Sequence, residues 1–167
     1  LPAATAVGRV DGARRLQVYW LAARSPGTPL ENPRQVSAYR YPRQYGPQSP
    51  SFARAMLPSS ASMPLLLSGT AAVVGHESRH AESVAAQLDE TLINFDSLLG
   101  AAHARRPELP AHFGAHTRLK VYVRDHDQLA EVSALLSTRL DPSVPRLVVL
   151  AAICRRELRI EIDGSHY

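Results

Sequence analysis

Hydrophobic and polar residues alternate most regularly near the end of the chain. One side of a two-residue period is hydrophobic and the other is polar, in the order Leu158, Arg159, Ile160, Glu161, Ile162, Asp163. This period is typical of a β-strand with one buried face. We therefore expect Glu161 in the middle of a strand, on the face opposite the hydrophobic core. There it either meets solvent, paired with Arg159 or Lys120, or lines a cleft closed by other parts of the chain or by a neighbouring subunit.

Patterns elsewhere predict further strands and two helices. We expect strands at residues 16–20, 119–123, 147–150 (fully buried) and 65–75 (interrupted at Gly69), and helices at residues 84–99, ending at Gly100, and 127–140, capped by Asp127. From residue 64 onward the order is strand, helix, strand, helix, strand, strand. Two helices cover only one face of such a sheet. We expect the other face to be covered by a neighbouring subunit or a sister domain.

The segment that precedes these elements is rich in proline. Eight of the thirteen prolines lie between residues 25 and 64, a density that disfavours long helices and most sheet pairing. Because the segment also carries tyrosines and arginines, it is more typical of a functional loop than of a spacer. We therefore divide the chain into residues 1–63, which hold a frayed lead-in (1–13), a strand and the Pro-rich loop, and residues 64–167, an α+β domain.

Composition narrows the class of protein. The 167 residues, 45% hydrophobic and 20% charged, indicate a soluble globular protein, and the lack of a run of about 18 apolar residues argues against a membrane span. A single Cys excludes an internal disulfide and a cysteine zinc cluster, and it suits the cytoplasm. The net charge of +4 is scattered, which favours small anionic ligands over nucleic acid. A start at Leu1 suggests a piece of a longer polypeptide.

Three groups of residues could carry chemistry. His76-Glu77-Ser78-Arg79-His80 matches the His-Glu-x-x-His pattern of zinc peptidases. The motif directly follows a predicted strand, however, so a polar turn is the alternative to a zinc hydrolase. Cys154 is either a nucleophile or, as we favour, a small apolar group of a pocket or the core. Arg155 and Arg156 diverge on a strand, so one of them can face a site and clamp a carboxylate.

Three stretches together resemble the chorismatase family, whose members remove the enolpyruvyl group of chorismate. They lie within residues 31–55, 67–94 and 153–162, and include Glu31-Asn32-Pro33-Arg34, Leu67-Ser68-Gly69-Thr70-Ala71 and Ile153-Cys154-Arg155. The second half of the chain is also similar, more distantly, to the RidA/YjgF fold of trimer-forming enamine deaminases. The resemblance implies an α+β RidA/YjgF-like (chorismate mutase-like) sheet with two helices on one face, preceded by the Pro-rich loop. It also implies that this chain is the C-terminal half of an enzyme built from two such halves. The enzyme would then be completed by the missing N-terminal half or by a trimer-like homo-oligomer.

The resemblance further implies a reaction and the residues that perform it. Glu161 matches the family's catalytic acid, which protonates the methylene carbon of the enol ether and so leads to release of pyruvate. Burial in a closed cleft should raise the pKa of Glu161, so that it is protonated near neutral pH. The residues expected to bind chorismate are Tyr39, Tyr45, Arg54, Gly69, Cys154, Arg155 and, by likeness to the Pro-x-Arg of RidA relatives, Arg146. Neither a cofactor nor a metal is implied.

The expected product and its alternatives follow from the same resemblance. With Gly69 and Cys154 at these positions, the chain resembles the branch of the family that excludes water and forms 3-hydroxybenzoate. Some members of this branch also form 4-hydroxybenzoate. Such products would serve as pigment or ubiquinone precursors. One alternative is a chorismate hydrolase, which admits water and gives a dihydroxycyclohexadiene carboxylate. The other two are a RidA-like deaminase or binding protein, and the zinc hydrolase of His76 and His80.

Overall fold

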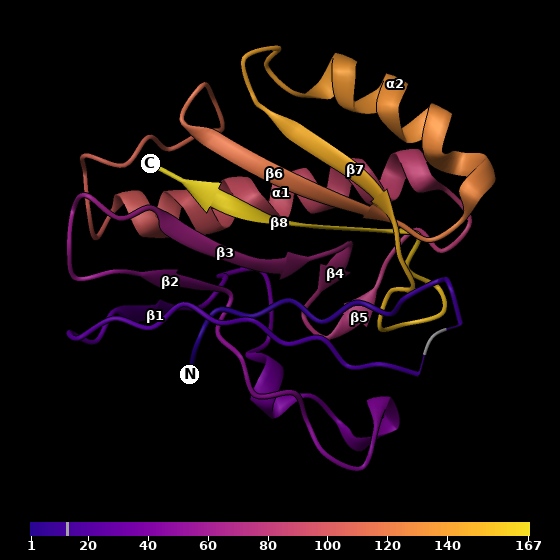
Figure 1. The fold of residues 1–167 in the computed structure, drawn as a ribbon, viewed down its shortest axis with the longest axis horizontal. Helices are drawn as coiled ribbons and strands as arrows, with labels where there is room; N and C mark the ends of the chain where they lie inside the picture. Colours follow the sequence, from indigo (N-terminus) through magenta and orange to yellow (C-terminus); the bar gives the residue numbers. More distant parts are fainter. Residues whose placement is uncertain (13) are drawn as a thin grey trace.

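The computed structural model describes residues 1–12 and 14–167, and at its centre lies one mixed β-sheet (Figure 1). Six strands of the described residues form it in the order β1-β2-β3-β8-β6-β7. They are β1 (Thr28–Leu30), β2 (Ala55–Leu57), β3 (Leu65–Thr70), β6 (Thr117–Val123), β7 (Arg146–Leu150) and β8 (Ile160–His166). β6 and β7 are parallel, and the other neighbours are antiparallel. β8, which carries the alternating pattern, therefore lies between β3 and β6.

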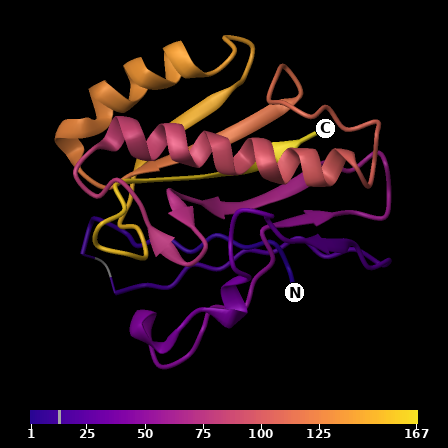
Figure 2. The same ribbon diagram turned by 180° about the vertical axis from the view of Figure 1, so that it is seen from behind.

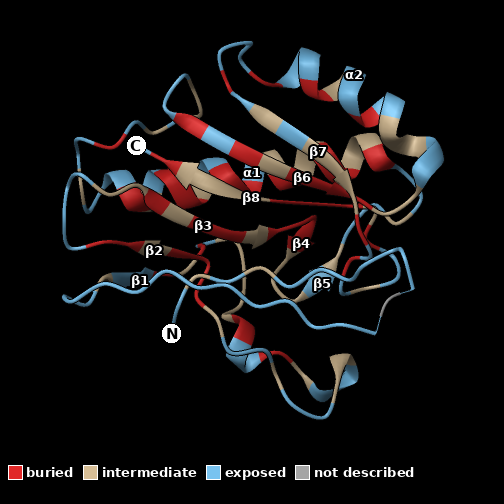
Figure 3. Ribbon diagram, viewed as in Figure 1, coloured by how far each residue is buried: buried red, intermediate tan, exposed pale blue. Residues whose placement is uncertain are grey.

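Two helices, α1 (Val84–His103) and α2 (Leu129–Arg139), cover one face of the sheet, which Figure 2 shows from behind. Because alternate residues of β8 point to this face, Ile160 and Ile162 lie in the core with Phe95 of α1 and Leu136 of α2. Buried residues follow the strands and the inner sides of the helices in Figure 3. The predicted α+β fold, with both helices on one face, is confirmed.

α1 extends further than the sequence predicts. It begins after Ser83, whose side chain accepts a hydrogen bond from a backbone N–H of the first turn, and it continues past Gly100 to His103. Glycine costs a helix only about 1 kcal/mol relative to alanine. Leu99 and Ala102 on either side of Gly100 are buried in the core, and their packing offsets that cost.

Two predictions for the second helix and the strand after it are wrong. Asp127 does not cap α2, because it lies inside a short 3-10 helix, η3 (His126–Gln128), and α2 begins after Gln128 without a side-chain cap. β7 is not fully buried, because it is the edge strand of the sheet, where Leu147 is 57% exposed. The strand Leu147–Leu150 is apolar throughout, so its sequence does not show which face meets solvent.

The strand predicted at residues 16–20 is also absent from the sheet. Leu16, Val18 and Trp20 are 91%, 62% and 81% exposed. Alternation gives a strand only where a partner strand and a buried face are available, and the described residues provide neither here.

Residues 2–8, which we name the strap, are held in place rather than frayed as predicted. Ala53 N–H donates to the Pro2 carbonyl at 2.8 Å, and Gly8 and Ala152 exchange two backbone hydrogen bonds at 2.7 and 2.9 Å. Between these points Gly69 N–H donates to Thr5 Oγ1 at 2.9 Å. The face opposite the helices, expected to need a neighbour as cover, is therefore covered in part by the chain's own strap.

The Pro-rich segment pairs with the sheet more than its prolines predict. β1 and β2 both belong to it, and β1 tolerates Pro29 because it is an edge strand. Between them lie two 3-10 helices, η1 (Ala38–Arg40) and η2 (Arg43–Tyr45), which project beyond the sheet in Figure 1. β4 (Val73–Val74) and β5 (Glu77–Ser78) form a separate hairpin. Within the described residues, the longest apolar helical stretch still falls short of what a membrane crossing requires.

Candidate active site

Glu161 is a buried acid at the centre of the sheet. It lies in β8 opposite Tyr122 of β6. Because its neighbours Ile160 and Ile162 fill the core, its side chain points to the face opposite the helices, as predicted. Only 5% of Glu161 is exposed. The alternative of a solvated carboxylate is therefore wrong.

The environment of Glu161 favours its protonated form. Burial raises the pKa of Glu161 to about 7, the negative charge of Asp163 adds to the rise, and the positive charge of Arg54 opposes it. A carboxyl group with this pKa is partly protonated near neutral pH, which is what general acid catalysis requires.

Tyr122 and Asp163 form a hydrogen-bonded pair beside Glu161, on the same face of the sheet. The Tyr122 hydroxyl donates to Asp163 Oδ2 at 2.8 Å. Burial, this hydrogen bond and the charge of Asp163 raise the pKa of Tyr122 well above its ordinary value. Tyr122 therefore keeps its proton and holds the Asp163 carboxylate two residues from Glu161 along β8.

β3 is irregular where it passes Glu161. Its register with β8 shifts between Leu67 and Thr70, a bulge or similar irregularity at the position where the sequence predicts an interrupted strand. A Cβ atom at Gly69 would lie 2.0 Å from Glu161 Oε1, closer than two unbonded atoms approach. Glycine is therefore required here by space, because the Glu161 carboxyl itself occupies the position of a side chain.

Arg54 lies within the Pro-rich segment, just before β2. It is 4% exposed, and its Nη2 donates to the Val36 carbonyl at 3.1 Å and to the Tyr41 hydroxyl at 2.5 Å. Its guanidinium also lies over the rings of Tyr41 and Phe52, 5.5 and 5.2 Å from their centroids. Nε is buried without a hydrogen-bond partner among the described residues. Since its charge acts on Glu161, Arg54 links the acid to the Pro-rich segment.

Arg155 stacks on two tyrosines of that segment. It lies in a turn between β7 and β8, not on a strand as predicted. Its guanidinium is 3.8 Å from the ring centroid of Tyr45 and 5.0 Å from that of Tyr41, which are cation–π contacts. Nη1 donates to the His76 carbonyl at 2.8 Å, while Nη2 is buried with no hydrogen-bond partner among the described residues. Tyr41 thus contacts both Arg54 and Arg155.

Three predicted site residues lie at the edge of the cluster formed around Glu161, Arg54 and Arg155, or away from it. Cys154 is exposed, so it is not a core residue. Protein atoms around its thiol group, together with the charge of Glu161, raise its pKa, which disfavours a nucleophilic thiolate. Tyr39 is 42% exposed. Arg146 donates to Ser137 of α2 at 3.0 Å and so lies on the helix-bearing side of the sheet, opposite Glu161.

The His-Glu-x-x-His motif lies on the β4–β5 hairpin and the turn that follows it, where a turn was predicted. His76 Nδ1 lies 3.3 Å from the Tyr45 hydroxyl, and His80 Nε2 lies 3.2 Å from Glu90 Oε2. The two histidines therefore have separate partners. Over residues 1–12 and 14–167, no group of three or more His, Cys, Asp and Glu side chains is placed to hold a metal ion.

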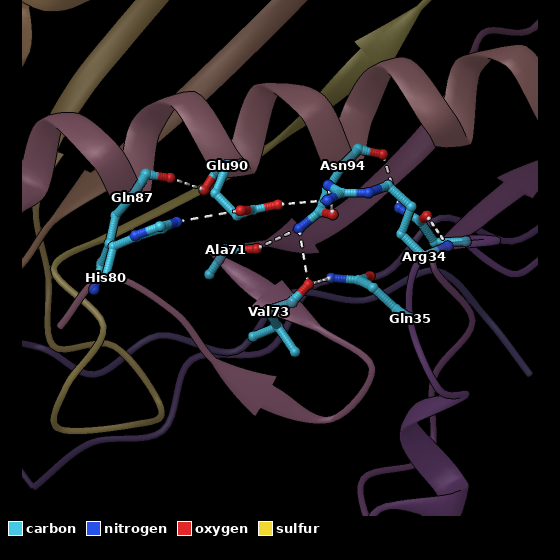
Figure 4. Close-up of polar contacts among 10 residues, drawn as sticks. Arg34, Gln35, Ala71, Val73, His80, Gln87, Glu90 and Asn94 are labelled. Atoms are coloured by element: carbon cyan, nitrogen blue, oxygen red, sulfur yellow. Dashed lines mark hydrogen bonds and ion pairs between the residues drawn. The ribbon is translucent and has the colours of Figure 1, made fainter.

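A buried polar network fixes the Pro-rich segment to α1 and to the chain around β4 (Figure 4). Asn94 of α1 is fully buried and donates to the carbonyls of Ala71 and Val73 at 3.0 and 2.9 Å. Its Oδ1 accepts from Arg34 Nη1 at 2.7 Å, and Arg34 Nη2 pairs with Glu90 at 2.7 Å. We name this network the anchor. It holds the chain that leads into η1 and η2, and thus the tyrosines of the site.

The structure joins most of the predicted site residues into one continuous group of contacts and charges. The group consists of Glu161, Gly69, Arg54, Arg155 and Tyr45, with Cys154 at its rim. Tyr41 also belongs to it, although it is not among the predicted site residues. The signal for Tyr41 was its place in the same run of tyrosines, but spacing along a loop does not show which rings point inward. The strap carries no motif and was also missed. The anchor was missed too, although its Arg34 lies in one of the stretches that carry the resemblance.

Comparison with known proteins finds curated relatives of this chain, although no family model matches it. A 3-hydroxybenzoate synthase from Streptomyces hygroscopicus is 36% identical over 171 residues, and a chorismatase from Streptomyces rapamycinicus is 35% identical over 170 residues. Each match covers 98% of this chain and 50% of the relative. The chain therefore spans about half the length of the curated relatives it matches.

Solved structures agree with these relatives. A crystal structure of a chorismatase has a TM-score of 0.77 at 32% identity, covering 86% of this chain and 44% of that one. A YjgF family protein from Neisseria meningitidis has a TM-score of 0.54 at 22% identity, covering 76% and 92%, a likeness of fold alone. Along nearly its whole length, this chain is therefore similar to about half of these longer relatives, chorismatases among them, and its fold is like that of the YjgF/RidA proteins.

Proposed function

We propose that this chain carries the acid-bearing half of a chorismatase, which splits chorismate into pyruvate and 3-hydroxybenzoate. The observation that carries the proposal is the Glu161 carboxyl, which is buried in the central strand and has a pKa raised to about 7. The names of the relatives, chorismatase and 3-hydroxybenzoate synthase, support the choice of substrate and product.

In this proposal Glu161 acts as a general acid and then as a base. Its proton moves to the methylene carbon of the enol ether, which gives an oxocarbenium ion. The hydroxyl group on the neighbouring ring carbon then attacks the ring carbon that carries the ether oxygen. The bond between that carbon and the ether oxygen breaks, its electron pair leaves with the oxygen as pyruvate, an epoxide forms on the ring, and the hydroxyl proton passes to the Glu161 carboxylate. The epoxide opens at the carbon that carried the hydroxyl group, its oxygen takes up a proton, and the other epoxide carbon loses one, which gives 3-hydroxybenzoate with no water consumed. Where water adds instead, the products are pyruvate and a dihydroxycyclohexadiene carboxylate.

The two carboxylates of chorismate are assigned to Arg54 and Arg155. Each guanidinium has one buried nitrogen without a hydrogen-bond partner among the described residues, Nε of Arg54 and Nη2 of Arg155. A buried donor without a partner is costly, and a substrate carboxylate would supply charge-assisted hydrogen bonds to it. Tyr41 and Tyr45, which lie against these groups, would hold the arginines in place and line the site.

We further propose that a second polypeptide surface completes the enzyme. The matched relatives are about twice as long as this chain. The side chains of Leu16, Val18 and Trp20 are mostly exposed, and protein surfaces of this kind are commonly covered in an assembly. The covering surface is either the other half of a longer enzyme or a further copy of the chain.

The test is to incubate the chain with chorismate, alone and together with the other half of a relative. Pyruvate release is followed by a coupled assay, and chromatography separates 3-hydroxybenzoate, 4-hydroxybenzoate and the diol. Glu161→Gln should abolish pyruvate release, whereas Glu131→Gln, an exposed residue of α2, should leave it unchanged. No pyruvate from either preparation, or equal rates with Glu161→Gln, would overturn the proposal. Pyruvate formed from an enamine but not from chorismate would favour a deaminase instead.

A further inference from the structure

The strap joins the three segments that surround Glu161. At its start, the Pro2 carbonyl accepts from the N–H of Ala53, the residue before Arg54. In its middle it is bound to β3 at Gly69, and at its end Gly8 pairs with Ala152. These segments are far apart in the sequence, although the first two also pair with each other through β2 and β3. The strap therefore belongs to the same site.

Thr5 is the residue of the strap that reaches the acid. Its Oγ1 accepts a hydrogen bond from Gly69 N–H at 2.9 Å. Its methyl carbon, Cγ2, lies 3.0 Å from the point where a Cβ of Gly69 would be, and Glu161 Oε1 lies 2.0 Å from that same point. The methyl group and the carboxyl group are therefore neighbours. Thr5 is half-buried, whereas Ala4 and Ala6 on either side are exposed.

We propose that the strap is the outer wall of the Glu161 site and that Thr5 is the positioning residue that keeps water from the Glu161 carboxyl. Threonine combines the two groups that this position requires. The hydroxyl fastens the strap to the bulge of β3, and the methyl group fills the space beside the carboxyl. Serine lacks the methyl group. Valine lacks the hydroxyl acceptor and leaves Gly69 N–H only its longer hydrogen bond to the Ala4 carbonyl, at 3.3 Å.

The consequence for the reaction rests on the proposed function. An oxocarbenium ion formed beside Glu161 can release pyruvate by attack of the substrate's own ring hydroxyl group or be attacked by water. A wall that excludes water therefore favours the hydroxybenzoate over the diol. Thr5 would be a specificity-determining residue, although it lies outside the regular strands and helices of the domain.

The experiment compares Thr5→Ser and Thr5→Val with Ala6→Ser, a matched change at an exposed position of the same strap. The first measurement is an infrared titration of the chain, in which the carboxyl band of Glu161 is identified by its loss in Glu161→Gln. Water beside the carboxyl favours its charged form, so both Thr5 variants should lower the pKa of Glu161, by about one unit. Ala6→Ser should not change it. Thermal unfolding of each variant shows that it is folded.

The second measurement is the ratio of diol to hydroxybenzoate formed from chorismate, which should rise at least severalfold in both Thr5 variants. If pyruvate is released but neither the titration nor the product ratio changes in either variant, the role of Thr5 is overturned and the proposed function stands. If no preparation releases pyruvate but the pKa of Glu161 falls in the Thr5 variants as expected, the proposed function fails. The role of the strap and Thr5 in excluding water from Glu161 is then still supported. The two variants remove different atoms of Thr5, so one that fails to fold leaves the other as a complete test.

Discussion

Glycine is required at two positions of the sheet, and the atoms that require it differ. A Cβ at Gly69 would lie 2.0 Å from Glu161 Oε1, the end of a side chain, whereas a Cβ at Gly164 would lie 2.2 Å from the Arg118 carbonyl oxygen, a backbone atom. A side chain can rotate away, but a paired strand cannot. The same substitution should therefore affect function at one position and stability at the other.

We expect Gly164→Ala to lower the free energy of unfolding by about 1–3 kcal/mol, because strand pairing must be distorted. Gly69→Ala should cost less stability but move the Glu161 carboxyl, and so lower the rate of pyruvate release by at least about a hundredfold. Gly100→Ala is the control, since nothing lies within 4 Å of its Cβ position, and it should stabilise the helix by about 0.5–1 kcal/mol. Urea unfolding and the pyruvate assay measure the two effects. Full activity in Gly69→Ala would contradict the assignment.

The buried acid should also make stability depend on pH. The pKa of Glu161 rises from its ordinary 4.5 to about 7 on folding, so the folded protein binds a proton more tightly than the unfolded chain does. Its contribution to stability is fully present below pH 4.5 and is lost as the pH rises through 7. The loss amounts to about 3 kcal/mol for a shift of this size.

Glu161→Gln removes this loss because glutamine stays neutral. Relative to the unsubstituted chain, the variant should gain about 3 kcal/mol of unfolding free energy at pH 8 compared with pH 4.5. Urea unfolding of both proteins at the two pH values measures this difference, in which the other titrating groups cancel. A difference that stays constant between the two pH values would show that Glu161 is not a buried neutral acid.

Asp163 should tune the acid through its charge. Its carboxylate contributes to the raised pKa of Glu161, so Asp163→Asn should lower that pKa. Because the protonated acid is the active form in the proposed reaction, the rate of pyruvate release should then fall at a lower pH than in the unsubstituted protein. The pH profile of kcat/KM measures the shift, with the exposed residue change Asp127→Asn as control. An unchanged alkaline limb would exclude this role.

At the scale of elements, the anchor determines where the site tyrosines lie. Asn94 binds Ala71 and Val73 of the β4 region, and Arg34 of the Pro-rich segment. The backbone continues the contact, since Val36 N–H donates to the Gly75 carbonyl at 2.9 Å. Between β1 and β2 the Pro-rich segment forms no strand of the sheet, so this network orders it there.

We expect Asn94→Ala to lower the free energy of unfolding by about 2–4 kcal/mol, because it leaves two carbonyls and a guanidinium without their partner. Hydrogen exchange at the Val36 and Gly75 amides should become faster than elsewhere in the sheet. Asp96→Ala, an exposed change on the same helix, should alter stability by no more than about 0.5 kcal/mol. Equal effects of the two substitutions would argue against the anchor.

Elements with a strong period and a buried face could be predicted from the sequence. α1, α2, β6 and β8 each have one, and each is present in the structure. The strand predicted at residues 16–20 has the period but no partner. β1 and β2 have partners but are only three residues long, too short to show a period. Whether such a segment forms a strand therefore depends on pairing with a distant segment, which the hydrophobic pattern does not show.

The part of the candidate site that could be predicted from the sequence is the part whose proposed chemistry requires a particular residue type. Glu161 could be placed on a strand face from its alternation, and its resemblance to a family acid gave it a role. Its burial was expected only from that resemblance and does not follow from the sequence pattern, because the strap that helps to cover it is held largely by backbone groups. Such hydrogen bonds can be made by almost any residue, so the small residues from Ala3 to Ala6 carry no signal of their contacts.

At the scale of the whole molecule, the single tryptophan reports on assembly. Trp20 is 81% exposed and is flanked by Tyr19 and Leu21, also mostly exposed. In the chain alone, iodide should quench its fluorescence efficiently. When the proposed second surface binds, the emission should shift to shorter wavelength and become protected. Trp20→Ser should weaken the association while changing the free energy of unfolding of the chain by no more than about 0.5 kcal/mol. Protection at every dilution would contradict the exposed arrangement.

The place of β8 between β3 and β6 matters for the folding of the chain during its synthesis as well as for the finished structure. Until residue 160 has been synthesised, β1-β2-β3 and β6-β7 are two separate pieces of sheet, because β8 is the strand that joins them. A nascent chain on the ribosome therefore carries the unpaired edge of β3, and from about residue 123 that of β6 as well, until β8 has been made. Such edges are the kind that chaperones shield and that aggregate readily. The residues that finally close the sheet also bring Glu161. The acid consequently appears only in a chain whose sheet can be completed, and a prematurely terminated product has neither.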